Sequence, residues 1–410
     1  MTASSTQRDP SGTTTLEGAG PSRDATTRWV GVGRGNDTDA HKAGADAAEE
    51  ALVGRVPALL VVFCWDGYDH GALLDGVRSV AGDAPLVGCS TAGEISMAGA
   101  GDASVVVTAF GGPGFHVATG AANAAELGLR EASAAAARCA ADLPEGGHQL
   151  LLLLTAGLGG DMEEIVRGAY QEVGAALPLV GGCAGDGLRM EQTVQLHGGS
   201  VLRHSVVAAA LSSDAPFGIG VRHGWSRVGE PLLVTASEDN RVLELDDQPA
   251  LDVYLDHLGA PPEAGHDPAA FTRFATTHPL GLQRRRGEQV RCVNEADFEA
   301  RALVCAGQVP QGGLTWAMEG DESSVLEASA SACRDALETL DGQPPLGLLA
   351  FDCIGRRGIL GEHGIQREVA RITDIAEGAP VAGFYTYGEI ARTHGQSGLH
   401  NQTLVVLAIG

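Results

Sequence analysis

The chain has 410 residues, about the length of two or three domains of roughly 150 residues each. Acidic residues outnumber basic ones by 52 to 27, and the formal net charge of -25 argues against binding to nucleic acid or to an anionic lipid surface. Lys42 is the only lysine and lies in an expected helix, which argues against a Walker A loop and against a pyridoxal Schiff base, since both need a lysine in the site.

The eight cysteines include no CxxC pair, and residues 1–28 are rich in Ser, Thr and Gly, without the apolar segment of a secretory leader. We therefore expect free thiols and a cytoplasmic location. No apolar run approaches the roughly 20 residues that span a bilayer, so direct insertion in a membrane is not expected.

In chain order, residues 1–28 lack a periodic apolar pattern and are predicted to form a disordered tail. Residues 29–225 are expected to form one domain that holds two repeated units. Alanine-rich amphipathic helices are predicted over 39–52 in the first unit and over 127–142 in the second. Each helix precedes an apolar strand, which indicates alternating helices and strands.

A second domain is expected over 226–410, with an insert over 226–312 and a third unit over 313–410, in which a short strand and then a helix over 324–339 precede the apolar strand. Within the insert the pattern predicts a helix over 249–258. It also predicts short strands over 231–235, 241–245, 271–275, 290–293 and 301–308.

One phrase occurs three times in the chain, over Pro85–Glu94, Pro178–Asp186 and Pro380–Glu389. Similar strands and helices flank each copy, so the repeated unit is predicted to be β-α-β-α-β-β. The predicted fold class is α/β, with α+β as the alternative, built from internally repeated units with mixed sheets in two domains. In such sheets, functional groups gather at the carboxyl ends of the strands, where the phrases lie.

The phrases share glycines that tolerate a positive φ, and each ends in an acid that accepts a hydrogen bond from a ligand amine or from backbone N–H groups. The alternative is that these Gly-acid turns are structural, and their triplication favours that interpretation. The residues concerned are Gly88, Gly93, Glu94, Gly181, Asp186, Gly388 and Glu389.

Departures from the repeat are a better guide to a site, and the third unit differs most. It carries Arg356 and Arg357 after its apolar strand, and Tyr385 and Tyr387 inside its phrase. An arginine fork holds a carboxylate, tyrosine hydroxyls orient it, and Glu389 accepts an ammonium group, which together suit an amino acid. The alternative is that Arg356 ties loops together through carbonyls and Glu389.

Four cysteines fall at expected strand ends, where a thiol packs, ligates a metal or reacts: Cys64, Cys89, Cys183 and Cys353. Cys89 is a candidate ligand contact. Cys353 is the candidate reactive thiol, because the two arginines after it favour a thiolate. A Cys-dependent enzyme acting on a small metabolite would use Cys353 as nucleophile with His363 or His394 as base.

These motifs resemble the FIST family of bacterial and eukaryotic sensory proteins. The resemblance rests on Val87–Ile95, Gly181–Asp186 and Asp247–Tyr254 in the N-terminal part, and on Phe351–Arg356 and Gly383–Ile390 in the C-terminal part, with Gly224–Trp225 and His400–Thr403 in addition. It implies a FIST N-terminal and a FIST C-terminal domain, and a small-ligand sensor in signal transduction, with amino acids as proposed ligands. The resemblance implies that family members are usually fused or adjacent to an effector such as a kinase or a cyclase, and because no output domain is recognised in these residues we expect signalling by association with a partner.

In one branch of the family the resemblance implies a haem that senses nitric oxide. The candidate axial ligands here are His278, His223 and His400. No CxxCH motif or paired metal spacing supports them, and a lone histidine is more often hydrogen-bonded within the protein. The hypotheses left open are therefore a non-enzymatic small-ligand sensor that signals through a partner, a haem sensor, and a Cys-dependent enzyme.

Overall fold

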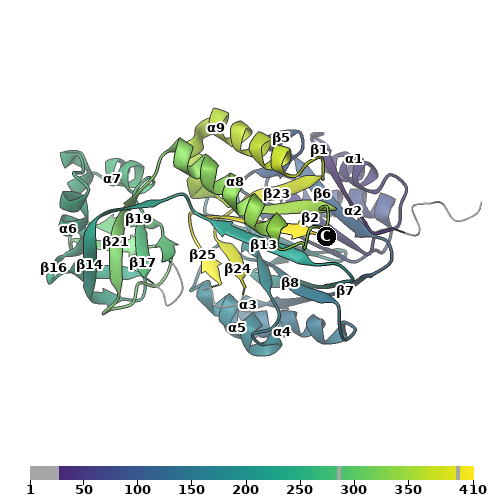
Figure 1. Cartoon of the computed structure of the whole chain (residues 1–410), viewed down its shortest axis with the longest axis horizontal. Coiled ribbons are helices and arrows are strands. Elements are labelled where there is room, and N and C mark those ends of the chain that lie inside the picture. The colour runs from purple at the N-terminus through teal and green to yellow at the C-terminus, as the bar shows by residue number, and fades with distance from the viewer. Residues whose placement is uncertain (1–26, 284–287, 394–397) are drawn as a thin grey trace, which may run out of the picture.

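The computed structural model describes residues 27–283, 288–393 and 398–410. A large α/β body carries one smaller lobe at its side, and the chain enters and leaves that lobe by adjacent strands (Figure 1). Nearly all of the expected disordered tail lies outside the described residues. Among those residues no helix is both long enough and apolar enough to cross a bilayer.

The first unit follows the predicted order, with a short hairpin added after the phrase. Its elements are β1 (Trp29–Gly35), α1 (Ala40–Leu52), β2 (Leu59–Trp65), α2 (His70–Ala81), β3 (Leu86–Thr91), β4 (Glu94–Ser96), β5 (Gly99–Gly101) and β6 (Val105–Gly111). Helix α1 begins where the Asp39 carboxylate accepts a hydrogen bond from the Lys42 N–H, and it ends at Val53 in the left-handed conformation. The hydrophobic spacing of the sequence therefore located these helices correctly.

The second unit has the same order. Its elements are β7 (Phe115–Asn123), α3 (Ala124–Leu127), α4 (Leu129–Ala137), η2 (Arg138–Asp142), β8 (His148–Thr155), α5 (Glu163–Val173), β9 (Leu179–Cys183), β10 (Val194–His197), β11 (Ser200–Arg203) and β12 (Ser205–Ser213). The expected helix over 127–142 is divided into α4 and the short 3-10 helix η2.

The third unit begins before the insert and resumes after it. Its elements are β13 (Phe217–Arg222), α8 (Glu322–Glu338), β22 (Gly347–Cys353), α9 (Ile354–Ile375), β23 (Val381–Thr386), β24 (Glu389–Arg392), β25 (Leu399–His400) and β26 (Leu404–Ile409). Strand β13 pairs with β26 along its whole length, from Phe217 opposite Ile409 to Arg222 opposite Leu404. The insert therefore interrupts the third unit after its first strand.

The three units exchange their hairpins in a closed cycle. Strand β4 of the first unit pairs with β23 of the third, with Ile95 opposite Gly383. Strand β24 of the third unit pairs with β9 of the second, and β10 of the second pairs with β3 of the first. The chain after each repeated phrase therefore leaves the sheet of its own unit and pairs in the sheet of another.

The inner faces of these three sheets meet in one hydrophobic core. Phe63, Phe351 and Phe384 come from two different sheets, and the rings of Phe63 and Phe384 lie 4.6 Å apart between centroids. Two main helices cover the outer face of each sheet: α1 and α2, α4 and α5, or α8 and α9 (Figure 1). The predicted α/β class with mixed, internally repeated sheets is confirmed.

The insert is an antiparallel half-barrel with its own core. Its elements are β14 (Ser226–Glu238), β15 (Arg241–Leu245), β16 (Gln248–Pro249), α6 (Ala250–His257), η3 (Pro262–Gly265), α7 (Pro268–Ala275), β17 (Leu280–Gln283), β18 (Glu288–Arg291), β19 (Val293–Asp297), β20 (Ala302–Cys305) and β21 (Leu314–Glu319). The strand expected over 271–275 is wrong, because this segment is the end of α7. Asp267 caps that helix and Pro268 fits its first position, so the helix signals prevail over the aromatic content of the segment.

Candidate functional site

Arg356, the expected carboxylate clamp, is fully buried. Its Nε donates to Asp352 Oδ1 at 2.6 Å, and its Nη2 donates to Glu368 Oε1 at 2.6 Å and to Ser329 Oγ at 2.7 Å. Burial, and then the Glu368 carboxylate, raise the Asp352 pKa well above its ordinary range. Arg356 therefore joins β22, α8 and α9 inside the protein, and its acidic partners are Asp352 and Glu368 instead of the expected Glu389.

The two tyrosines of the third phrase lie in different surroundings. Tyr385 is fully buried, and burial followed by the Glu368 carboxylate raises the pKa of its hydroxyl. Tyr387 instead donates its hydroxyl hydrogen to Asp186 Oδ1 and accepts the Leu188 N–H at 2.7 Å. The structure brings Tyr385 to the Arg356 network, and it places Tyr387 against a loop of the second unit.

The three phrase acids are all satisfied inside the protein. Asp186 accepts the backbone N–H groups of Met190, Glu191 and Gln192 at 2.7 to 3.0 Å, and so shapes the loop over 186–192. Although burial opposes it, these bonds and that from Tyr387 lower the Asp186 pKa. Glu94 and Glu389 are each buried among hydroxyl groups, and burial raises the pKa of each to about 7. As a group, these acids hold the phrases together.

All eight cysteines are free, and the four at strand ends are buried. Burial raises the Cys353 pKa well above its ordinary value, and the Glu389 carboxylate adds to the effect. The expectation that the adjacent arginines would favour a thiolate is therefore wrong, because Arg356 is already neutralised by two carboxylates. Burial likewise raises the Cys89 pKa. His363 is exposed on α9, and His394 lies outside the described residues.

Each of the three histidines considered for haem is engaged with groups of the protein. His278 stacks on Phe274 with 4.2 Å between ring centroids, and its Nδ1 lies 2.8 Å from the Phe274 carbonyl oxygen. His223 Nδ1 accepts the Trp225 N–H, and burial lowers the His223 pKa to about 4. His400 Nε2 lies 3.0 Å from the Ala391 carbonyl oxygen. Over residues 27–283, 288–393 and 398–410, no three metal-binding side chains cluster as a metal site.

A cavity of about 670 Å³ lies where the three units meet. Its walls come from the end of β2, the first phrase and the β5–β6 turn, from the loop after the second phrase, and from the first turns of α9. The lining residues are Trp65, Asp66, Thr91, Ala92, Gly93, Asp102, Gly187, Leu188, Arg189, Ile354, Arg357, Gly358, Gly361 and Glu362. The cavity therefore uses the carboxyl end of a parallel strand pair, as expected for an α/β sheet.

Five residues of the lining carry charged side chains: Asp66, Asp102, Arg189, Arg357 and Glu362. Arg357 binds Asp102 with both Nη atoms, at 2.6 and 2.8 Å, and its Nη1 also donates to the Ala92 carbonyl at 3.1 Å. Asp66 has only 3% of its side chain exposed, and neither of its carboxylate oxygens accepts a well-directed hydrogen bond from a described residue. Within the part of the chain that the structure describes, its one ionic contact is with Arg189, whose Nη2 lies against Oδ2. Asp66 therefore keeps bonding capacity on the cavity wall.

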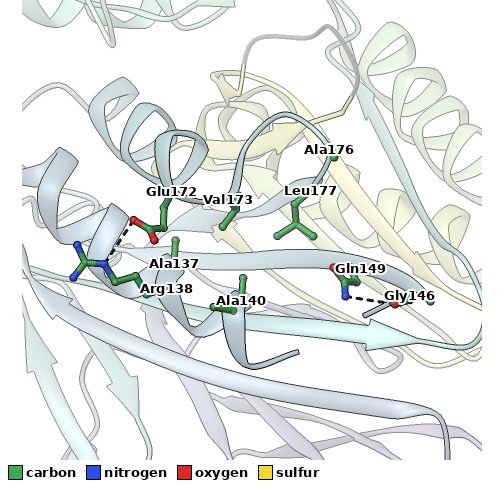
Figure 2. Close-up of a pocket in the computed structure, with 11 residues that line it drawn as sticks. Ala137, Arg138, Ala140, Gly146, Gln149, Glu172, Val173, Ala176 and Leu177 are labelled. Atoms are coloured by element: carbon green, nitrogen blue, oxygen red, sulfur yellow. Dashed lines mark hydrogen bonds and ion pairs between the residues drawn. The ribbon is translucent and has the colours of Figure 1, made fainter. Parts of the chain in front are cut away.

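A second cavity, of about 450 Å³, lies in the second unit between η2 and the end of α5 (Figure 2). Most of its lining is alanine and glycine. Its charged pair, Arg138 and Glu172, is 3.6 Å apart, and Gln149 donates to the Gly146 carbonyl (Figure 2). Gln149 also donates to the Pro144 carbonyl. Because these polar side chains already have partners, this cavity has less capacity for a ligand than the one at Asp66.

Family models match almost the whole described chain. The FIST N domain matches residues 58–248 and the FIST C domain matches residues 250–392. The chain belongs to the FIST family. FIST domains are associated with sensing in signal transduction.

Relatives of this FIST protein are described only as uncharacterized proteins. One from Mycobacterium tuberculosis is 26% identical over 399 residues, which cover 91% of this chain and 97% of the relative. One from Methanocaldococcus jannaschii is 26% identical over 189 residues, which cover 44% of this chain and 36% of the relative. A solved structure of PurLQS from Thermotoga maritima covers 93% of this chain and 72% of its own at 12% identity, but its TM-score of 0.21 supports no inference.

In this FIST protein Gly93 of the first phrase lines the main cavity, but the charged residues of its lining are not the ligand-binding residues expected from the sequence. Asp66 directly follows the apolar stretch of β2, and a carboxylate at that position is a usable signal in the sequence. Arg357 is next to Arg356 in the sequence, but the expected carboxylate clamp was Arg356, which does not line the cavity. Arg189 carried no signal in the sequence, because its place on the cavity wall depends on the loop after the second phrase.

Proposed function

We propose that this FIST protein is a sensor for a small ligand that carries a cationic nitrogen, such as an amino acid or an amine, and that it signals through a partner protein such as a histidine kinase or a cyclase. The ligand binds in the cavity at Asp66. One observation carries the proposal: the buried Asp66 carboxylate lies on the wall of a cavity that all three units line, its Oδ1 has no hydrogen-bond partner among the described residues, and its Oδ2 is paired with the half-exposed Arg189.

The physical argument rests on the cost of the buried charge. A buried carboxylate without enough hydrogen bonds is unfavourable, and a cation that donates to it recovers part of that cost. The other charges of the cavity support a cationic guest, because the acids Asp66, Asp102 and Glu362 outnumber the two arginines that line it. Arg357 already holds Asp102 with both Nη atoms, so the ligand's cationic group matters more than a carboxylate.

The position of the cavity supports a signalling role. A ligand in contact with Asp66, with the loop over 187–189 and with α9 bridges the first, second and third units. It therefore favours the arrangement in which these segments are close together, and a partner that binds this arrangement receives the signal.

Thermal unfolding with a panel of amino acids and primary amines tests the proposal. A ligand that binds the native state adds RT ln(1 + [L]/Kd), which is about 2.7 kcal/mol at 100 times Kd. We expect stabilisation of the wild type and its loss in Asp66→Asn, which keeps the size of the side chain but removes its charge. Glu172→Gln in the second cavity is the matched control and is expected to respond like the wild type. A wild type that ignores the whole panel, or an Asp66→Asn variant that responds fully, would overturn the proposal.

A further inference from the structure

We infer that the group recognised at Asp66 is a guanidinium, and that Arg189 is a built-in guest which a guanidino compound displaces. This inference rests on the proposed function and makes its ligand class more specific. It starts from the fact that the cavity already holds a guanidinium: Arg189 Nη2 lies against Asp66 Oδ2.

The two partners of this pair differ in burial. The Asp66 side chain is 3% exposed, whereas that of Arg189 is 50% exposed. Removal of Asp66 from its place would disturb the end of β2, but Arg189 can turn away into solvent. Asp66 is therefore fixed in its position, whereas another cation can replace Arg189.

The loop that carries Arg189 is fixed by hydrogen bonds to its backbone, but the residues on either side of Arg189 are exposed to solvent. Asp186 and Tyr387 hold the base of the loop by hydrogen bonds. The neighbours of Arg189, Leu188 and Met190, both have positive φ, and these residues are 61% and 62% exposed. Few apolar contacts are lost when this tip moves, so the departure of Arg189 costs little.

The charges of the cavity favour replacement by another cation. Without Arg189, three carboxylates remain in the lining, on Asp66, Asp102 and Glu362, and the single guanidinium of Arg357 is bound to Asp102. A planar guanidinium can donate two parallel hydrogen bonds to Asp66, which an ammonium group cannot do. Trp65 lies in the same wall, and a guanidinium interacts favourably with an indole face.

The test uses methylguanidinium chloride as probe and methylammonium chloride at equal concentration as comparison, with calorimetry and thermal unfolding as readouts. We expect the wild type to prefer methylguanidinium. We expect Arg189→Ala to bind this probe about threefold to tenfold more tightly, since removal of a competitor that fills the site in roughly 70 to 90% of molecules raises the apparent affinity by that factor. Asp66→Asn is expected to lose binding, and Arg138→Ala, in the more exposed ion pair of the second cavity, is expected to match the wild type.

The possible outcomes separate this inference from the proposed function. If amino acids or amines stabilise the wild type through Asp66 but methylguanidinium is not preferred, or Arg189→Ala binds it no more tightly, the built-in guest is disproved and the sensor proposal stands. Weaker binding by Arg189→Ala would make Arg189 a ligand contact and would also overturn the inference. If no compound binds either protein, both proposals fail.

Discussion

Glu94 and Glu389, from the first and third phrases, make the same contacts. Each accepts a hydrogen bond from the threonine three residues before it, Thr91 or Thr386. Each also accepts both the backbone N–H and the hydroxyl of one later residue, Ser104 or Thr403. This equivalence shows that the repeated acid closes the turn that carries the chain from one sheet to the next.

The first prediction concerns the pH dependence of stability. Burial raises the pKa of Glu94 and Glu389 from an ordinary 4.5 to about 7, so the folded protein binds these protons more tightly than the unfolded chain. Their contribution is fully present below pH ~4.5 and is lost as the pH rises through ~7, at a cost on the order of 3 kcal/mol for each group. The free energy of unfolding, measured by urea titration, is expected to fall from pH 5.5 to pH 8.

Glutamine variants give the control for this effect. The double variant Glu94→Gln, Glu389→Gln cannot ionise at these positions, so its stability is expected to change less between pH 5.5 and 8 and to exceed that of the wild type at pH 8. Stability below pH ~4 is expected to fall in both proteins, because Asp102 and Asp186 have lowered pKa values and become protonated there. A wild type with constant stability from pH 5.5 to 8 would contradict the prediction.

The second prediction concerns Arg356. Its replacement by alanine leaves Asp352 and Glu368 buried without their cation, and loss of one partner of a buried ion pair typically costs about 3–5 kcal/mol. Chemical denaturation measures this cost. Arg334→Ala is the control. It removes an exposed arginine that pairs with Glu327 on α8, and it is expected to change the free energy of unfolding by less than about 0.5 kcal/mol. Equal costs for the two variants would show that the Arg356 network does not stabilise the fold.

The third prediction concerns the hydroxyl of Tyr387. Tyr387→Phe removes the bonds to Asp186 and to the Leu188 N–H while it keeps the ring. Loss of a hydrogen bond of about 1 kcal/mol makes opening of the 186–192 loop roughly fivefold more frequent. We expect faster cleavage by trypsin after Arg189, detected by mass spectrometry, with cleavage at other arginines unchanged. An unchanged rate after Arg189 would mean that the loop does not depend on this hydroxyl.

The fourth prediction concerns the exchanged hairpins. A fragment over 29–213 keeps the first two units but loses β24 from the edge of β9 and β23 from the edge of β4. Its core also lacks Phe351 and Phe384. We expect this fragment to unfold without cooperativity and to lack near-ultraviolet circular dichroism, and we expect both properties to recover when a fragment over 214–410 is added. A fragment that folds cooperatively by itself would show that the exchange is not required.

Much of the fold follows from patterns within short stretches of sequence. Helix α1 is recognisable because Asp39 and the alanine spacing are local signals, and the triplicated phrase predicts three equivalent units. Only the pairing of strands explains why the phrases need glycine. A Cβ at Gly181 would lie 1.9 Å from the Leu153 carbonyl oxygen, and a Cβ at Gly383 would lie 2.1 Å from the Ala350 carbonyl oxygen.

The sequence by itself determined the repeated α/β architecture and the family, because both depend on short motifs and on hydrophobic spacing within local stretches of the chain. Only the tertiary structure decided where the phrases go and which side chains face a cavity, since the spacing along the chain does not say which sheet edge a hairpin will join. Arg356 was expected at a ligand and is enclosed by acids from β22 and α9. Asp66 and Arg189 are far apart in sequence. They meet because contacts among the three units place the loop over 186–192 next to the end of β2.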